Sequence, residues 1–81
     1  MPTVTYQSGE EVRIGDIVDV GEGRGPKMRV VVIISSGEAA DGFDAREWAY
    51  LGKGVVLQDA EVFGLLHLDE LDHEQVLIER A

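Results

Sequence analysis

The sequence Arg29-Val30-Val31-Val32-Ile33-Ile34 contains five consecutive β-branched residues. Their stiff side chains suit the pleated surface of a β-strand. Both faces of such a strand are apolar, so we expect it to be buried on two sides. Two arrangements satisfy this expectation. The strand lies at the centre of a small barrel, or it lies at an interface between two subunits.

Further strands are predicted on the N-terminal side of this run. Residues 12–14 and 18–20 alternate between apolar and charged side chains, and Gly15-Asp16 marks a turn between them. Alternation with a period of two is typical of a half-buried strand. Residues 21–26 hold three glycines and a proline, and this composition predicts a loop or a long hairpin turn.

On the C-terminal side, residues 54–58 and 62–68 predict two strands, and residues 75–79 predict a last strand. A terminal helix over residues 69–80 is the alternative for the end of the chain, because its acidic residues are tolerated in a first helical turn. Together these elements predict a mainly β fold of about five short strands, either a small barrel or a strongly bent sheet.

A polar and acidic segment separates the central run from these later strands. We expect a long acidic loop near residues 36–50, with a short helical turn that begins after Asp44. An Asp side chain can accept hydrogen bonds from the free amides at the start of such a turn. Trp48 is predicted to close one end of the core, which leaves an interface role open for Tyr50.

The composition limits the class of protein. With 81 residues the chain predicts one domain over residues 1–81, and the absence of cysteine excludes disulfides and thiolate metal sites. A net charge of −9 argues against binding to nucleic acid or to an anionic membrane. The N-terminus lacks the pattern of a signal peptide and no apolar run is long enough for a membrane helix, so a cytoplasmic location is expected.

Neither a catalytic residue nor a cofactor is predicted. The serines lie in no motif that would activate a nucleophile, and the acidic residues are spread too evenly to define an acid–base pair. One cluster has side chains that could bind a metal ion, namely His67, Asp69, Asp72, His73 and Glu74. Its spacing matches no established ligand signature, so we expect no metal site and no enzyme activity.

The acidic residues are concentrated in the second half of the chain. Residues 54–81 hold seven acids and one cation, whereas residues 1–34 hold five acids and four cations. Solubility alone would explain this bias, and a negative face that attracts a basic protein partner would explain it as well. The candidate partner-binding residues are Glu38, Asp41, Asp44, Glu47, Tyr50, Asp59, Glu61, Asp69, Glu70, Asp72 and Glu74.

Two patterns resemble known families. The pattern Gly9-x-x-Val12-x-x-Gly15-Asp16-x-Val18 resembles the opening of SH3-like barrels, which implies a small SH3-like barrel. The second pattern runs from Trp48-Ala49-Tyr50-Leu51-x-x-Gly54-Val55 through Gly64-Leu65-Leu66-His67 to Leu77-Ile78-Glu79-Arg80. It is similar to small bacterial proteins encoded beside the toxin effectors of interbacterial (type VI) secretion systems, which are taken to be their immunity proteins.

This resemblance implies a protein that binds a cognate toxin effector acting in the cytosol, such as a nuclease, and occludes it through an acidic surface. Two other hypotheses fit the same residues. The chain could be a non-catalytic adaptor or assembly domain, or it could mimic nucleic acid and thereby inhibit a nuclease. In the adaptor hypothesis a homodimer would form through the strand Val30, Val31, Val32, Ile33 and Ile34.

Overall fold

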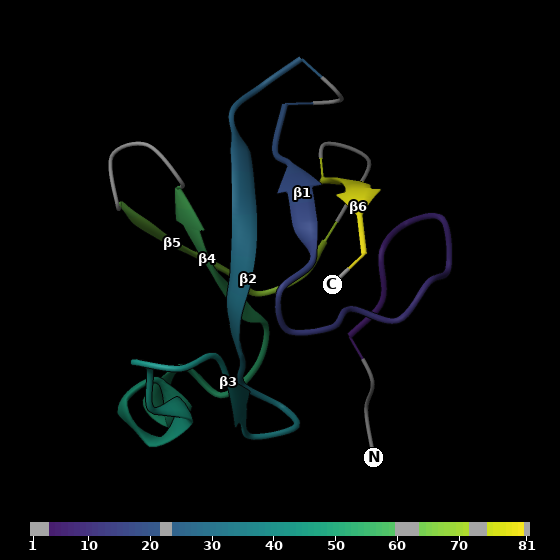
Figure 1. The fold of residues 1–81 in the computed structure, drawn as a ribbon. Helices are drawn as coiled ribbons and strands as arrows, with labels where there is room; N and C mark the ends of the chain where they lie inside the picture. Colours follow the sequence, from purple (N-terminus) through teal and green to yellow (C-terminus); the bar gives the residue numbers. More distant parts are fainter. Residues whose placement is uncertain (1–3, 22–23, 60–63, 72–74, 81) are drawn as a thin grey trace.

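The structure, a computed structural model, describes residues 4–21, 24–59, 64–71 and 75–80, which form a mainly β fold (Figure 1). Among these residues, six strands form one antiparallel sheet, and the helical structure is limited to two 3-10 turns. The strands are β1 (Ile17–Asp19), β2 (Lys27–Ile33), β3 (Glu38–Ala39), β4 (Val55–Asp59), β5 (Leu65–Leu68) and β6 (Val76–Glu79). The turns are η1 (Ala45–Glu47) and η2 (Ala49–Leu51). None of the described helical segments is long and apolar enough to cross a membrane.

The order of the strands across the sheet is β5-β4-β2-β1-β6, and β3 pairs with β2 beside this path. Every pair is antiparallel. β5 and β6 therefore form the two ends of the sheet, and within the described residues no pairing joins them. The predicted mainly β fold is confirmed, whereas closure of the sheet into a barrel stays a prediction.

β2 is the central strand, and its β-branched run packs on both faces of the sheet. Residues 30–33 are at most 4% exposed. A bulge in the pairing with β4, between Val30 and Val32, directs Val31 and Val32 to one face and Val30 and Ile33 to the other. The expected burial on two sides is confirmed.

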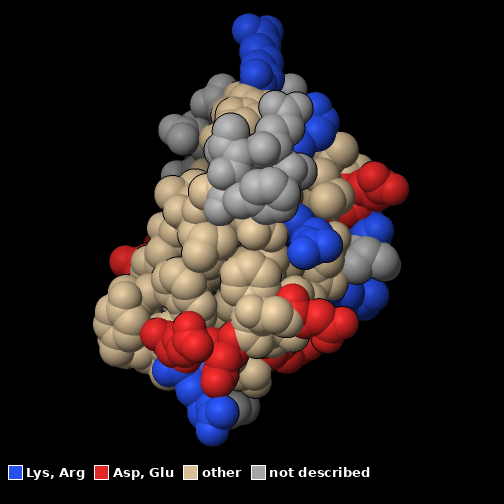
Figure 2. Space-filling model, turned by 60° about the vertical axis from the view of Figure 1, so that its left-hand side comes forward, with Lys and Arg blue, Asp and Glu red and all other residues tan. Residues whose placement is uncertain are grey.

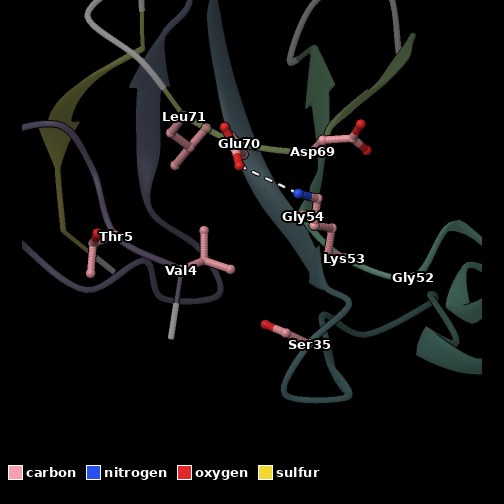
Figure 3. Close-up of a pocket in the computed structure, with 9 residues that line it drawn as sticks. All are labelled: Val4, Thr5, Ser35, Gly52, Lys53, Gly54, Asp69, Glu70 and Leu71. Atoms are coloured by element: carbon pink, nitrogen blue, oxygen red, sulfur yellow. Dashed lines mark hydrogen bonds and ion pairs between the residues drawn. The ribbon is translucent and has the colours of Figure 1, made fainter. Parts of the chain in front are cut away.

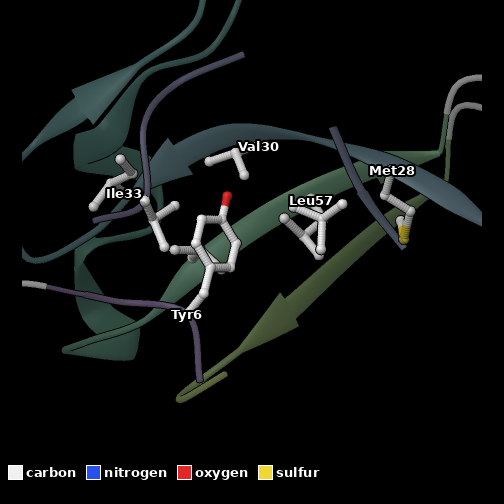
Figure 4. Packing of buried hydrophobic residues seen from close by; sticks show 8 residues of the cluster. Tyr6, Met28, Val30, Ile33 and Leu57 are labelled. Carbon is white, nitrogen blue, oxygen red and sulfur yellow. The ribbon is translucent and has the colours of Figure 1, made fainter. Parts of the chain in front are cut away.

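The two faces of the sheet carry separate apolar clusters. Burial of one large apolar side chain stabilises a fold by about 1.5–3 kcal/mol, so the cluster with more members contributes most of the packing energy. The first cluster, drawn in Figure 4, consists of Tyr6, Val12, Val18, Met28, Val30, Ile33, Val55 and Leu57. The second cluster consists of Val31, Val32 and Val56.

The homodimer predicted through residues 30–34 stays a prediction, and residues 30–33 offer it little free surface. Their side chains are buried inside one copy of the chain, and the strand is paired on both of its edges, with β1 and β3 on one side and β4 on the other. A second copy would find neither an exposed apolar face nor free backbone groups there.

The connection between β1 and β2 is a hairpin that depends on two glycines. The Oδ1 atom of Asp19 accepts hydrogen bonds from the amides of Gly21 (2.8 Å) and Gly25 (3.0 Å). A Cβ atom on Gly21 would lie 2.7 Å from the Cα atom of Gly25, so only glycine permits this approach of the two backbones. Gly21 and Gly25 of the predicted glycine-rich turn are thus structural elements of the hairpin, and residues 22–23 lie outside the described part of the chain.

A buried carboxylate ties the N-terminal segment to the end of the sheet. Asp16 is fully buried, and its Oδ2 atom accepts hydrogen bonds from the Tyr6 hydroxyl (2.7 Å) and the Arg13 amide (2.9 Å). Arg80 donates to the same oxygen at 3.3 Å and to the carbonyl of Glu11 at 2.7 Å. Burial, and then the carboxylate beside it, raise the pKa of Tyr6 well above its ordinary value.

The last strand decides between the two predictions for the C-terminal part. Residues 76–79 are a strand, because Leu77 pairs with Val18 and packs against the first cluster. The alternative of a helix over residues 69–80 is therefore wrong. The strands predicted at 54–58 and 62–68 are confirmed as β4 and β5, and residues 62–63 lie outside the described part of the chain.

The strands predicted at residues 12–14 and 18–20 are only partly confirmed. β1 covers residues 17–19, but residues 12–14 are not part of the sheet. Val12 is buried in the first cluster, and the segment pairs only through an isolated bridge between Thr5 and Glu11. The sequence does not predict the short strand β3, which lies inside the segment that it predicts as a loop.

Candidate interaction surface

Residues 35–53, named the excursion, lie between β2 and β4 and cover the second apolar cluster. The chain first turns back as β3, which pairs with the end of β2, and then forms η1 and η2. Five of its side chains are small or aromatic apolar groups that pack against the second cluster. They are Ala39, Ala40, Phe43, Ala45 and Trp48. The excursion is therefore a packed element that presents its polar side chains outward.

Asp44 is the N-cap of η1, as predicted. Its Oδ1 atom accepts a hydrogen bond from the Arg46 amide at 2.9 Å. The Arg46 guanidinium also binds both carboxylate oxygens, at 3.2 and 3.1 Å. These side-chain hydrogen bonds, followed by the amide, lower the pKa of Asp44, and the same pair raises the pKa of Arg46. The charge of Asp44 is thus matched by its own neighbour.

The other three acids of the excursion are exposed. Glu38 lies in β3, Asp41 in the turn that follows, and Glu47 at the end of η1. Among the described residues none of the three forms an ion pair. Figure 2 shows acidic side chains towards the lower end of this face, with basic side chains beside and below them and an area with few charges above.

Two aromatic residues of the excursion have opposite surroundings. Trp48 is half-buried and packs against the second cluster, which confirms that it belongs to the core. Tyr50, in η2, is 80% exposed. A large exposed aromatic side chain beside uncompensated acids is a typical anchor of a protein interface.

The predicted site residues beyond the excursion differ from this group. Asp59 is half-buried in β4. Asp69 and Glu70 are exposed but have cationic or basic neighbours, because Asp69 lies 3.5 Å from Nε2 of His67 and Glu70 forms a 3.3 Å ion pair with Lys53. Three further predicted site residues lie outside the described part of the chain, namely Glu61, Asp72 and Glu74.

Asp69 and Glu70 lie at the edge of a hollow of about 410 Å³ (Figure 3). The Lys53–Glu70 ion pair spans one part of its wall. The hollow is lined by Val4, Thr5, Ser35, Gly52, Lys53, Gly54, Asp69, Glu70 and Leu71. Both ends of the excursion, Ser35 and Lys53, thus reach the hollow, so the structure brings the excursion close to these two acids.

The possible metal ligands are only partly described. His67 and Asp69 belong to the described residues, and Nε2 of His67 lies 3.0 Å from the carbonyl oxygen of Lys53. Because a carbonyl only accepts hydrogen bonds, this nitrogen must carry a hydrogen and cannot also bind a metal ion. Over residues 4–21, 24–59, 64–71 and 75–80, no group of three His, Asp or Glu side chains is arranged to hold an ion.

Sequence reasoning missed the role of the buried acids. Asp16 and Asp19 count as ordinary acids in the charge balance, yet both are fully buried and bind backbone amides. The Gly-Asp turn at Gly15-Asp16 was the available signal for the first of them. Lys53 was also missed, and its glycine neighbours, Gly52 and Gly54, both with positive φ, were the signal for a turn there.

Comparisons with protein-family models, with curated proteins and with solved structures found no match to this chain.

Proposed function

We propose that this chain is an immunity-type protein that binds a basic toxin effector acting in the cytosol and occludes it through the acidic face of the excursion. The observation that carries the proposal is the exposure of Glu38, Asp41 and Glu47 without any ion pair among the described residues. Tyr50 lies in the same element and is 80% exposed. The sequence resemblance to proteins encoded beside toxin effectors supports the same role.

The charges suit fast binding of a cationic partner. Uncompensated surface acids attract a basic protein over a distance of about 10 Å at moderate salt and raise the rate of encounter. Asp44, Asp69 and Glu70 contribute less to this attraction, because each has a basic neighbour within 3.5 Å. We therefore place the centre of the binding surface on the excursion.

Occlusion of an enzyme requires a surface that holds its shape. The excursion meets this requirement because Trp48 and Phe43 anchor it on the second cluster and Asp44 caps η1. A preorganised surface loses little conformational entropy when it binds, and this favours tight association.

The proposed fold is a small SH3-like barrel that is open between β5 and β6. The pattern from Gly9 to Val18 supports it, and so does the antiparallel meander of short strands around β2. In this arrangement the excursion is a long insertion between β2 and β4.

The test is binding to the protein encoded beside this chain. The unmodified chain should co-purify with that protein and restore growth to cells that produce it. The triple variant Glu38→Gln, Asp41→Asn, Glu47→Gln removes three negative charges and keeps the side-chain shapes. We expect it to bind at least about tenfold more weakly, because the attraction for a basic partner is reduced.

A matched control removes the same number of charges from another part of the surface. Glu10→Gln, Glu11→Gln, Glu79→Gln alters exposed acids of the N-terminal segment and β6, and its affinity should stay close to that of the unmodified chain. A neighbouring toxin that is neither bound nor neutralised contradicts the proposal. Equal losses in both triple variants would contradict the location of the surface on the excursion.

A further inference from the structure

The end strand β5 lacks the features that usually protect an exposed sheet edge. Its sequence is Leu65-Leu66-His67-Leu68, with no proline and no lysine. Leu65 is 46% exposed and Leu66 is 37% exposed. Natural edge strands are commonly shielded by charges, prolines or bulges, because an open edge pairs with other chains. At the other end of the sheet, β6 also exposes apolar side chains, Val76 (39%) and Ile78 (45%), but it carries Glu79, and Arg80 follows it.

The pairing register shows which backbone groups of β5 point outward. The Asp59 amide donates to the Gly64 carbonyl at 2.9 Å, so these two residues form a hydrogen-bonded pair of the ladder with β4. In an antiparallel ladder such pairs alternate with pairs that do not exchange hydrogen bonds. The pairs Leu65–Gln58 and His67–Val56 are therefore of the second kind, the pairs that do not exchange hydrogen bonds.

Residues of the second kind direct their N–H and C=O groups away from the partner strand. The backbone groups of Leu65 and His67 thus point to the free side of β5. Within the described residues no other strand pairs with that side. Four hydrogen-bonding groups, two donors and two acceptors, thus face away from every described strand and could bind an added one.

This edge lies beside the excursion. His67 is the cross-strand partner of Val56, and Val56 belongs to the second cluster, which the excursion covers. Cross-strand partners share a face, so the side chains of His67 and Leu65 lie on the face of the excursion. Figure 1 shows β5 and the 3-10 turns on the same side of the molecule.

The charges around the edge select the occupant. Asp69 and Glu70 directly follow β5, and their side chains are 65% and 81% exposed. A second copy of this chain would bring another net charge of −9 to the edge and would be repelled. A cationic segment would be attracted by the same net charge, to which Asp69 and Glu70 contribute less because His67 and Lys53 lie beside them.

We propose that the free edge of β5 binds an extended, lysine- or arginine-bearing segment of the partner as an added strand. Main-chain hydrogen bonds to Leu65 and His67 hold this segment, and apolar side chains of the segment cover Leu65 and Leu66. The inference rests on the proposed function, since it describes how the partner of the excursion is also held. It predicts that the partner binds through two adjoining regions, an acidic one and a strand edge.

The direct test uses a short synthetic peptide of alternating valine and threonine preceded by two lysines. Amide hydrogen exchange of the unmodified chain is followed by NMR with and without the peptide. We expect exchange at the Leu65 and His67 amides to slow by at least about tenfold. The Leu66 amide, already bonded to β4, serves as the internal reference. No change at Leu65 and His67 would overturn the inference.

Two variants test the edge in the complex with the neighbouring toxin. Leu65→Pro removes an outward N–H without removing a hydrogen bond to β4, because proline is tolerated on the free side of an edge strand. Leu65→Lys keeps the backbone and places a repelling charge on the edge, and it covers the case in which the proline variant does not fold. Both should bind the toxin at least about tenfold more weakly.

The outcomes separate the two proposals. Toxin binding that is lost in the excursion triple variant but unchanged in both Leu65 variants overturns the strand addition and leaves the proposed function intact. Peptide addition at Leu65 without any binding of the toxin supports the strand edge and contradicts the proposed function. A dimer that light scattering detects in the unmodified chain, and that Leu65→Lys dissolves, overturns the choice of occupant.

Discussion

At the scale of single residues, two acids stabilise the fold from within. Asp16 and Asp19 are fully buried. Asp16 accepts hydrogen bonds from a hydroxyl and a backbone amide, and Asp19 accepts them from two backbone amides. A buried carboxylate is tolerated only when such donors surround it. These two side chains therefore belong to the architecture, and the surface charge is carried by the other acids.

Replacement of Tyr6 by phenylalanine should destabilise the chain. Tyr6→Phe keeps the buried ring but removes the 2.7 Å hydrogen bond to Asp16. A hydrogen bond to a charged group contributes about 1.5–3 kcal/mol, so we expect a loss of this size in the free energy of unfolding. Urea denaturation measures it. Tyr50→Phe, at an exposed position, is the control and should change stability by less than about 0.5 kcal/mol.

The same tyrosine should make stability depend on alkaline pH. Its pKa is raised in the folded state above the ordinary value of 10.0, so the protonated form is favoured by folding. The stabilisation is fully present below about pH 10 and declines as the pH rises above that value. Thermal unfolding between pH 8 and pH 11 should show this decline in the unmodified chain, and Tyr6→Phe should show a shallower one.

At the scale of elements, the excursion is held by a few contacts with the outer face of the sheet. Trp48 packs against the second cluster, and its Nε1 atom is buried without a hydrogen-bond partner among the described residues. The tryptophan therefore contributes apolar area and no hydrogen bond to a described residue. The acids of the excursion depend on this anchor for their positions.

Trp48→Ala should loosen the excursion more than the sheet. Loss of a half-buried aromatic side chain should lower the free energy of unfolding by about 2 kcal/mol, less than for a fully buried one. Trp48→Phe should lose less than half of that, because no hydrogen bond to a described residue is lost. Limited proteolysis within residues 35–53 should accelerate in the alanine variant. Equal proteolysis rates in all three proteins would contradict the anchoring role.

The elements also show what the sequence could predict and why. The β-branched run at 30–34 and the apolar residues at 76–78 reflect local packing, so the strands there were predictable. The neighbours of β2 were not, because its pairing with β4 depends on residues that are distant in sequence. For the same reason, the exposure of Glu38 could be predicted from the polar segment around it. The ion pair of Glu70 with Lys53 could not, because the two residues are 17 positions apart.

At the scale of the whole molecule, the acids behind the net charge of −9 differ in their burial and in their pairing with basic residues. Two acids are buried and several have basic neighbours within 4 Å, so the field outside the molecule depends on fewer groups than the composition suggests. Among the described residues, the excursion contributes three of them on one side. Long-range attraction of this kind acts mainly on the rate of association.

Salt should therefore weaken binding to the basic partner through the association rate. Between about 0.01 M and 0.5 M salt, we expect that rate to fall by about tenfold or more, because the Debye length shrinks from about 30 Å to less than 10 Å. The dissociation rate should change much less. Stopped-flow mixing measures both rates, and a salt-independent association rate would contradict an electrostatic role of the excursion.

The contact between Asp16 and Arg80 joins residues 64 positions apart, and β1 likewise pairs with β6. During synthesis on the ribosome, the early half of the sheet must wait until residues 76–80 have left the exit tunnel. Until then the outer edge of β1 and the carboxylate of Asp16 lack these partners. Stable folding of the sheet is therefore expected only after residues 76–80 have emerged, and a nascent chain arrested before residue 76 should remain sensitive to protease.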